Sequence, residues 1–359
     1  MAKNRQQGNG DGDVDDLISK VNPPENVRAL LAQNRRLRQA LSEYKREHGM
    51  LENMMDEVMS LIPALQPRPS VFKPQQHQSS PLTAILHVTD IHYGAMQEQD
   101  EIEGFGRFSP QIATARMHGL MKDEIQSVEL HRNSFNVPSL AILITGDLVS
   151  GDIHEELRVT NAFPVPAQAI GVTQLLCEMI QMAEPHFETI DVHMITDDNH
   201  GRLTKKPQAK EAGINNWCYV AGNMLARSFH HTPNVKINVY PMNQKVVNVN
   251  GYRYLMCHGH DIMGWMGFPY YGIERRAARE ALKRMNAPDF TKFDAVLLGH
   301  WHAPMRHLWY RVGGSVSGTD AFDHKQGRHA QPMQVSWFIH PKWGEFDVTE
   351  WQLNKHDPV

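Results

Sequence analysis

The sequence predicts a layered α/β domain over residues 83–359, and two observations lead to this fold class. Apolar runs of strand length alternate with amphipathic segments of helix length, and 41% of the 359 residues are hydrophobic, which is enough for a large core. In addition, five of the apolar runs end in Asp, Asn or His. In an α/β sheet, polar groups at the carboxyl ends of strands line a common crevice, so these ends mark the expected functional site.

The residues before this domain form three predicted segments. Residues 1–24 are polar and have the composition of a disordered tail. In residues 25–62, apolar positions recur at spacings of three and four, and this narrow seam favours a coiled-coil helix. Asn34 at an a position favours a parallel homodimer, whereas the alternative is a helix that packs on its own domain. Residues 63–82 are rich in proline and are expected to form an extended linker.

Within the domain, strands and helices are expected to alternate. Segments with the strand pattern are 85–89, 140–144, 189–195, 235–240, 245–249, 252–257 and 295–298. Segments with the helix pattern are 110–132, 165–184, 216–229 and 273–285. The remaining alternating runs, from Trp309 to Trp351, are expected to be terminal strands that close a second sheet.

Composition and charge indicate the cellular compartment of the protein but do not identify its binding partner. The net charge of -4 gives no overall basic character, which neither indicates nor excludes a nucleic-acid partner. The three cysteines, Cys177, Cys218 and Cys257, are widely spaced, as is typical of free thiols in a reducing compartment. The sequence shows no apolar run of membrane-spanning length and no leader. We therefore expect a cytoplasmic protein without a membrane partner.

The polar strand ends supply seven candidate metal ligands. They are Asp90, His92, Asp147, Asn199, His258, His300 and His302. Ionisable groups are rarely buried without partners, so metal binding explains five such strand ends better than coincidence does. Carboxylate, amide and imidazole donors together suit Mn, Fe, Zn or Ni rather than Ca or Mg. Seven donors are too many for one ion with open positions, and they suit two divalent ions that share a carboxylate.

The order of these motifs resembles the calcineurin-like metallophosphoesterases: Asp-x-His, Gly-Asp, Asn-His, His-Gly and Gly-His-x-His. Segments 151–157 and 200–207, together with the coiled coil, are similar to phage and prophage members of that family. The resemblance implies a four-layer α/β/β/α sandwich of two mixed sheets, and the cytoplasm of a host cell if the chain is phage-encoded. It also implies these ligand roles: Asp90, His92 and His302 for one ion, Asn199, His258 and His300 for the other, and Asp147 as the bridge.

The resemblance further implies hydrolysis of a phosphate ester by a hydroxide between the two ions, with His200 as the general acid. The sequence departs from the family pattern at Asp198, where the family usually has Gly, and at Gly201, where the family usually has an acid. Asp tolerates the left-handed backbone better than most residues, so a turn at position 198 is possible. Ser150 stands where some members have an Asp that orients the catalytic histidine. The expected partner of His200 is then Asp152, His154 or a backbone carbonyl.

Substrate contacts are expected on basic residues close to the metal ligands. Arg202, Lys205 and Lys206 follow the catalytic histidine, and segment 273–285 is also basic; the alternative is a solvated basic face. His260 and Asp261 are candidates for orienting the ligand imidazoles.

We therefore expect a Mn-dependent phosphodiesterase or nuclease acting on DNA or RNA. The alternatives are an enzyme for small nucleotides or phosphomonoesters, and a metal-binding scaffold in which the departures at Asp198 and Gly201 have abolished catalysis.

Overall fold

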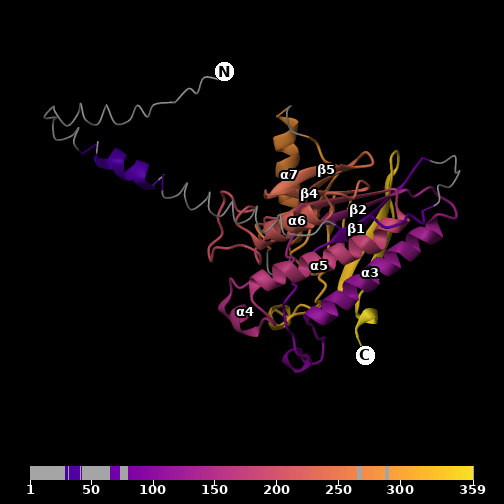
Figure 1. The fold of residues 1–359 in the computed structure, drawn as a ribbon, viewed down its shortest axis with the longest axis horizontal. Coiled ribbons are helices and arrows are strands. Elements are labelled where there is room, and N and C mark those ends of the chain that lie inside the picture. The colour runs from indigo at the N-terminus through magenta and orange to yellow at the C-terminus, as the bar shows by residue number, and fades with distance from the viewer. Residues whose placement is uncertain are drawn as a thin grey trace, which may run out of the picture. The chain divides into compact units, whose positions relative to one another are not determined.

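A computed structural model describes residues 29–30, 32–40, 42, 65–72, 80–264, 269–287 and 291–358 (Figure 1). Contacts along the chain separate residues 1–61 from residues 62–359, and each unit is considered by itself. The described residues between 29 and 42 are helical, as expected for that segment. The other positions of the coiled coil, the tail of residues 1–24 and part of the linker lie outside the described residues. The homodimer therefore stays a prediction.

The first sheet contains six strands in the order β11-β10-β1-β2-β3-β4. Their bounds are Thr83–Val88 (β1), Ser139–Ile144 (β2), Thr189–Ile195 (β3), Val235–Tyr240 (β4), Met333–His340 (β10) and Gly344–Gln352 (β11). Strands β1 to β4 are parallel, and β10 lies antiparallel to β1. The central strands β1 and β2 are buried almost throughout, which explains why they are continuous apolar runs. The four parallel strands end at the same edge.

The second sheet contains five strands in the order β5-β6-β7-β9-β8. Their bounds are Gln244–Val249 (β5), Tyr252–Cys257 (β6), Ala295–Leu298 (β7), Met305–Arg306 (β8) and Tyr310–Val312 (β9). Strands β6, β7 and β9 are parallel, whereas β5 and β8 are antiparallel to their neighbours. The sheet is therefore mixed, as the first one is.

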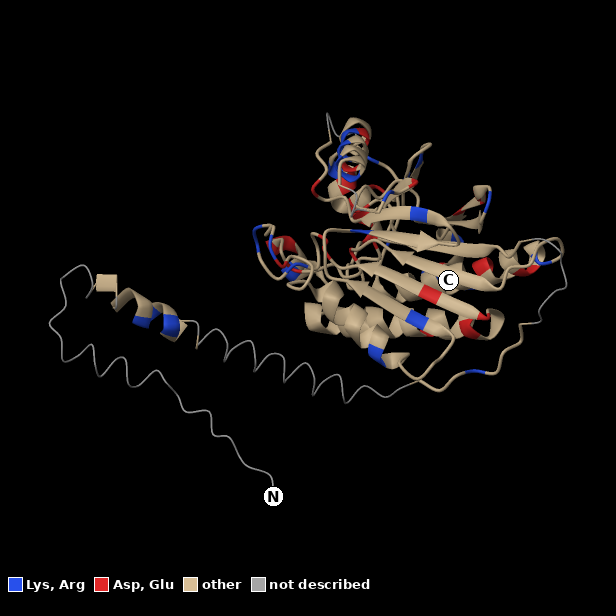
Figure 2. Ribbon diagram, turned by 90° about the horizontal axis from the view of Figure 1, so that it is seen from above, with Lys and Arg blue, Asp and Glu red and all other residues tan. Residues whose placement is uncertain are grey.

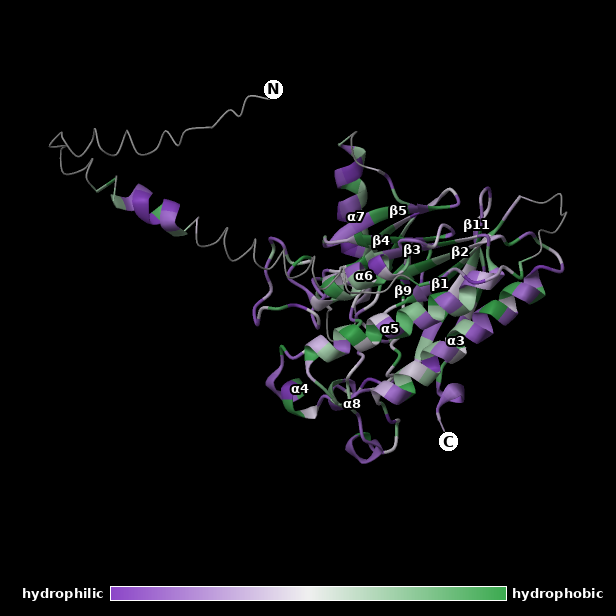
Figure 3. Ribbon diagram, viewed as in Figure 1, coloured by the Kyte–Doolittle hydropathy of each residue, from purple (hydrophilic) through white to green (hydrophobic). Residues whose placement is uncertain are grey.

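Three hydrophobic cores show that the domain has four layers. Helices α3 (Pro110–His131), α5 (Val165–Ala183) and α6 (Trp217–Ser228) form one core with the first sheet. A second core lies between the two sheets, and a third joins the second sheet to α7 (Tyr270–Met285). Figure 3 shows both hydrophobic and hydrophilic residues around α3 and α5, as expected for helices with one face on a sheet. The order α/β/β/α agrees with the expected architecture.

The helices and strands begin and end within three residues of the predicted bounds. Capping explains two of the helix starts, because Ser109 accepts a hydrogen bond from the Ile112 N–H and Asn216 accepts one from the Cys218 N–H. The short helices α4 (Glu155–Thr160) and α8 (Ala321–Lys325) were not predicted.

The expectation that the terminal strands close the second sheet is wrong for β10 and β11, and is correct only for β9. Strand β10 needs an apolar layer on each side. Trp337 faces the core between the sheets, where its Nε1–H donates to the Tyr254 hydroxyl at 2.8 Å, and Phe338 faces the helices. Its position beside β1 in the first sheet supplies both layers.

The structure agrees with two simpler expectations about the chain. All three cysteines carry free thiols, and two of them are buried. Among the described helices, none combines the length and the apolar character that a membrane span requires.

Candidate metal centre

The strand pairing brings the predicted ligands together. Val88 of β1 lies beside Ile144 of β2, so Asp90 and Asp147 leave the sheet at adjacent positions. In the second sheet, Met256 lies beside Leu297, and His258 and His300 follow these two residues. Among the described residues, ligand atoms within 4.8 Å of one another form four groups: Asp90, His92 and His302; Asp147, His258 and His300; His92, Asp147 and His200; and His302, Asp320 and Asp323.

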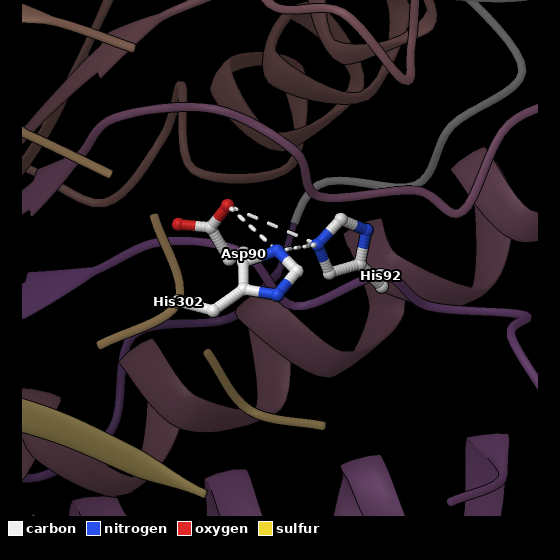
Figure 4. A group of neighbouring side chains, drawn as sticks. All are labelled: Asp90, His92 and His302. Carbon is white, nitrogen blue, oxygen red and sulfur yellow. Dashed lines mark hydrogen bonds and ion pairs between the residues drawn. The ribbon is translucent and has the colours of Figure 1, made fainter. Parts of the chain in front are cut away.

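In the first group, three ligand atoms converge on one point (Figure 4). The Nε2 atoms of His92 and His302 lie 3.1 Å apart, and each lies within 3.8 Å of Asp90 Oδ1. Asp90 is fully buried, and its Oδ2 accepts a hydrogen bond of 2.6 Å from the Thr89 hydroxyl. The backbone N–H of His300 also donates to this carboxylate. Oδ1 is thus held toward the two imidazoles, and only a proton or a metal ion between these atoms offsets their repulsion.

In the second group, the tautomer of His258 is set by the backbone. Its Nδ1 lies 2.8 Å from the carbonyl oxygen of Thr145, so Nδ1 carries the proton that is donated there. Nε2 lies 3.0 Å from Asn199 Oδ1 and 3.0 Å from Asp147 Oδ2. Asp147 Oδ2 is buried and accepts no hydrogen bond from the part of the chain that the structure describes. These three acceptor atoms fit a divalent cation.

Asp147 connects the two groups, as expected of a bridging ligand. Its carboxylate belongs to the group of His258 and also to a group that contains His92. Its Oδ1 accepts a hydrogen bond of 3.1 Å from the backbone N–H of His200. The donor set therefore fits two ions around a shared carboxylate.

The charges of the centre point to cation binding as well. Burial raises the pKa of the Asp90 carboxyl, although neighbouring histidines act to lower it. Burial acts to lower the pKa of His258, but the carboxylates of Asp147 and Asp90 raise it to about 10. Burial likewise acts to lower the pKa of His302, but Asp323 and Asp90 raise it to about 9. Burial lowers the pKa of His92 and His300 well below the usual value, so only the imidazoles of His258 and His302 hold extra protons that offset the carboxylate charge without metal. Metal binding has to release these protons.

The backbone is strained at most of the ligands. Left-handed φ angles occur at Asp90 (51°), His92 (48°), Asp147 (47°), His300 (71°) and His302 (59°). Each costs roughly 1–3 kcal/mol in a residue other than glycine. Space is also restricted, because a Cβ atom at Gly299 would lie 2.0 Å from Thr89 Oγ1. Strain concentrated in one set of polar residues is typical of a functional site.

His200 lies beside the centre and is oriented by a backbone carbonyl. Its ring centroid is 4.6 Å from that of His92, and its Nδ1 is 2.7 Å from the carbonyl oxygen of Ser150. Of the three expected partners, the structure therefore places the carbonyl at His200. Asp152 and His154 are exposed, and the His154 ring centroid is 6.2 Å from that of His200. Nε2 of His200 is left facing the centre.

Asp198 and Gly201, the two departures from the family pattern, are joined by a hydrogen bond. Asp198 Oδ2 accepts a hydrogen bond from the Asp147 N–H at 3.0 Å, and Oδ1 accepts one from the Gly201 N–H at 2.8 Å. A Cβ atom at position 201 would lie 2.1 Å from Asn216 Oδ1, which explains the glycine. Asp198 does not need the left-handed backbone that Asp tolerates, because its φ is not positive. Its carboxylate supports the loops that carry the ligands and is not one of the grouped ligand atoms.

The basic residues after His200 have different environments. Arg202 donates to the carbonyl oxygens of Thr204 and Lys205 and so stabilises its own loop. Lys205 forms an exposed ion pair of 3.2 Å with Glu155. Lys206 is exposed and has no ion pair among the described residues. Of the three expected substrate contacts, Lys206 is the most available.

The two residues expected to orient ligand imidazoles differ as well. The ring centroid of His260 is 5.7 Å from that of His258, and its buried Nδ1 has no hydrogen-bond partner in the described part of the chain. His260 also lines a small cavity together with Asp197 and Arg202. Asp261 instead forms an ion pair of 2.8 Å with Arg276 of α7, so the expected contact with a ligand is not seen.

Asp323 is a residue of the centre that the sequence did not reveal. Its Oδ2 lies 2.7 Å from Nδ1 of His302, and its side chain is buried. Asp320 precedes it and caps helix α8 by accepting the Asp323 N–H at 2.7 Å. The only sequence signal was this Asp-x-x-Asp pattern at a short helix start, and nothing in it indicates the contact with His302.

No protein-family model matches this chain, and no curated protein sequence is similar to it. The solved structures that are similar in part include the following three, each with 10% sequence identity. A Vps29 variant from Entamoeba histolytica is matched over 76% of this chain and 99% of its own, with a TM-score of 0.28. The sulfate thiohydrolase SoxB from Thermus thermophilus is matched over 82% and 59%, with a TM-score of 0.33. The phosphopantetheinyl hydrolase from Mycobacterium tuberculosis is matched over 71% and 98%, with a TM-score of 0.26. At such scores the likeness carries no argument, and the function has to be inferred from the site.

Proposed function

We propose that this chain is a two-metal phosphoesterase that hydrolyses phosphodiester bonds of DNA or RNA. The observation that carries the proposal is the convergence of two sets of metal-capable donor atoms on the shared carboxylate of Asp147. Divalent ions, when bound there, supply Lewis-acid polarisation of the phosphoryl oxygens and lower the pKa of water. The mixed donor set favours Mn, with Fe, Zn or Ni as alternatives.

The residues of the chain supply the proton transfer. In the imidazolium form of His200, Nδ1–H donates to the Ser150 carbonyl and Nε2–H faces the centre. Nε2 can give its proton to the leaving oxygen while Nδ1–H stays in place, which leaves a neutral imidazole that takes a proton from water. A positioned acid of this kind contributes roughly 10² to 10⁴ to the rate.

Metal content and activity test this proposal together. After reconstitution with Mn, elemental analysis of the full chain should give two ions per chain, and Asp147→Asn should lower that number. Hydrolysis is then assayed on single- and double-stranded DNA, RNA, a cyclic dinucleotide, an aryl phosphodiester and an aryl phosphomonoester.

Each pattern of results has a distinct meaning. Cleavage of nucleic acid supports the proposal, and activity on only the small diesters or the monoester supports the alternative substrate class. Two bound ions with no hydrolysis of any of these compounds would support a metal-binding scaffold. No more than one ion, unchanged by Asp147→Asn, would overturn the two-metal centre.

A further inference from the structure

Helix α7 carries a local positive charge in a chain whose net charge is negative. It contains five basic residues, Arg275, Arg276, Arg279, Lys283 and Arg284, and two acidic ones, Glu274 and Glu280. Its net charge is therefore +3, whereas that of the whole chain is -4. Figure 2 shows these blue segments on the helix at the top of the view. A positive charge of this size on one helix is either neutralised by acidic side chains of the same protein or available to bind an anionic partner.

Internal neutralisation involves only part of the helix. Glu280 forms ion pairs with Arg276, Lys283 and Arg284. Glu274 accepts a hydrogen bond from Trp309 Nε1 at 2.8 Å and lies 3.4 Å from His307 Nδ1. Glu274 and Glu280 thus interact with other residues and do not neutralise Arg275 or Arg279.

The solvent-facing side combines arginine with tyrosine. Arg275 and Arg279 are exposed, and neither forms an ion pair with any residue that the structure describes. Tyr271 is 68% exposed, and the guanidinium carbon of Arg275 lies 5.9 Å from its ring centroid. Because Tyr271, Arg275 and Arg279 are spaced by four residues, they lie along one face over about 12 Å. We call these three residues the α7 stripe.

Helix α7 packs on segments that adjoin ligands of the metal centre. The helix start packs on the loop after His258, since a Cβ atom at Gly272 would lie 2.3 Å from the Met263 carbonyl oxygen. The ion pair between Arg276 and Asp261 ties the helix to the same loop. The α7 core also includes Leu298, which immediately precedes the segment with His300. The helix that carries the stripe is therefore attached to the segments that carry His258 and His300.

We propose that the α7 stripe binds a single-stranded segment of the nucleic acid whose phosphodiester bond reaches the metal centre. This inference rests on the proposed function, because it takes nucleic acid as the substrate. Arginine side chains can contact the phosphates, and an exposed tyrosine ring offers a stacking surface for an unpaired base. A protein partner fits less well, because the stripe presents two unpaired cationic groups that an ordinary apolar interface would have to desolvate.

Binding can be measured apart from hydrolysis. The full chain is titrated, in EDTA to prevent cleavage, into fluorescently labelled single-stranded DNA and into a duplex of the same sequence. We expect Arg275→Ala with Arg279→Ala to weaken single-strand binding roughly tenfold and to reduce the slope of log affinity against log salt by roughly 1.4. Tyr271→Ala should weaken single-strand binding by a similar factor and affect duplex binding less. The matched control is Lys122→Ala with Lys236→Ala, two exposed lysines of the first-sheet half.

The Mn-loaded variants are assayed in parallel on a small aryl phosphodiester, which is too short to reach the stripe, and their rates should stay unchanged. Wild-type affinity for single strands in the α7 variants would overturn the inference, whatever the activity. The inference would also be overturned if the lysine control lost as much single-strand affinity as the α7 variants. The same holds if the α7 variants changed their oligomeric state and kept their DNA affinity. If no phosphoester is hydrolysed and the stripe still binds single strands, the proposed function fails and the binding surface stands.

Discussion

Nδ1 of His302 lies 2.7 Å from the carboxylate oxygen Oδ2 of Asp323. This contact fixes the ring so that Nε2 of His302 is directed at His92 and Asp90, where it can bind a metal ion once it has lost its proton. A buried carboxylate behind a metal-binding imidazole holds the ring in place and makes its free nitrogen more basic. Asp323 is therefore a positioning residue, and it acts through His302.

Replacement of Asp323 should weaken metal binding. We expect Asp323→Ala to lower the Mn affinity roughly 10- to 100-fold, since it removes the acceptor behind His302. Asp323→Asn keeps a carbonyl oxygen that can accept from Nδ1, so its loss should be smaller. The measurement is competition against a metal-binding dye, with Asp261→Asn as the control because Asp261 pairs with Arg276 at the surface. Equal affinity of wild type and Asp323→Ala would show that the contact does not position the ligand.

The convergence of the candidate metal ligands could be predicted from the sequence, because each stands within a few residues of the end of an apolar strand. That rule needs only the residue types at the strand ends, and it brought together candidates as distant in the chain as Asp90 and His302. The orientation of His200 could not be predicted, because its partner is the backbone carbonyl of Ser150, which any residue at position 150 would offer. The role of Asp198 was missed for a similar reason, since its carboxylate binds backbone N–H groups.

The fold could be predicted up to the pairing of its last strands. Alternation of strands and helices defined the layers, because each pattern has its own period. The pairing of β10 with β1 depends on which layer covers each face of Trp337 and Phe338, and both residues are simply apolar in the sequence. Asp323 illustrates the same limit, because its contact with His302 is made across the loops at the end of the fold.

Glu124 of α3 should make stability depend on pH. It is buried, and burial raises its pKa to about 7 from an ordinary 4.5. A group whose pKa is higher in the folded state stabilises the fold fully below pH 4.5, and this contribution disappears as the pH rises through 7. The difference in pKa corresponds to about 3 kcal/mol. We expect Glu124→Gln to match the wild type at pH 4.5 and to be more stable at pH 8.

Urea unfolding at several pH values measures this difference. The variant isolates Glu124 because other titrating groups, such as the buried His87 with a pKa lowered to about 3, contribute equally to both proteins. Glu188→Gln on the surface is the control and should leave the pH profile unchanged. A constant difference between Glu124→Gln and wild type from pH 4.5 to 8 would mean that Glu124 does not titrate in this range.

Substitution of His200 should affect the rate of hydrolysis without affecting metal binding. His200→Ala is expected to keep two Mn ions per chain and to lower turnover by roughly 10² to 10⁴. The loss should be larger for a DNA diester, whose alkoxide leaving group needs a proton, than for an activated aryl diester that leaves without one. Steady-state rates on the two substrates, with elemental analysis of the same samples, measure both effects.

The alternative role of His200 predicts a different result, because one of its ring nitrogens lies within 4.8 Å of ligand atoms of His92 and Asp147. If His200 were a ligand, His200→Ala would lose metal and slow both substrates alike. Asn199→Ala is the comparison for that outcome, since Asn199 Oδ1 lies 3.0 Å from Nε2 of His258, a member of a ligand group. Loss of metal from His200→Ala to the level of Asn199→Ala would therefore reassign His200 from the leaving oxygen to the metal centre.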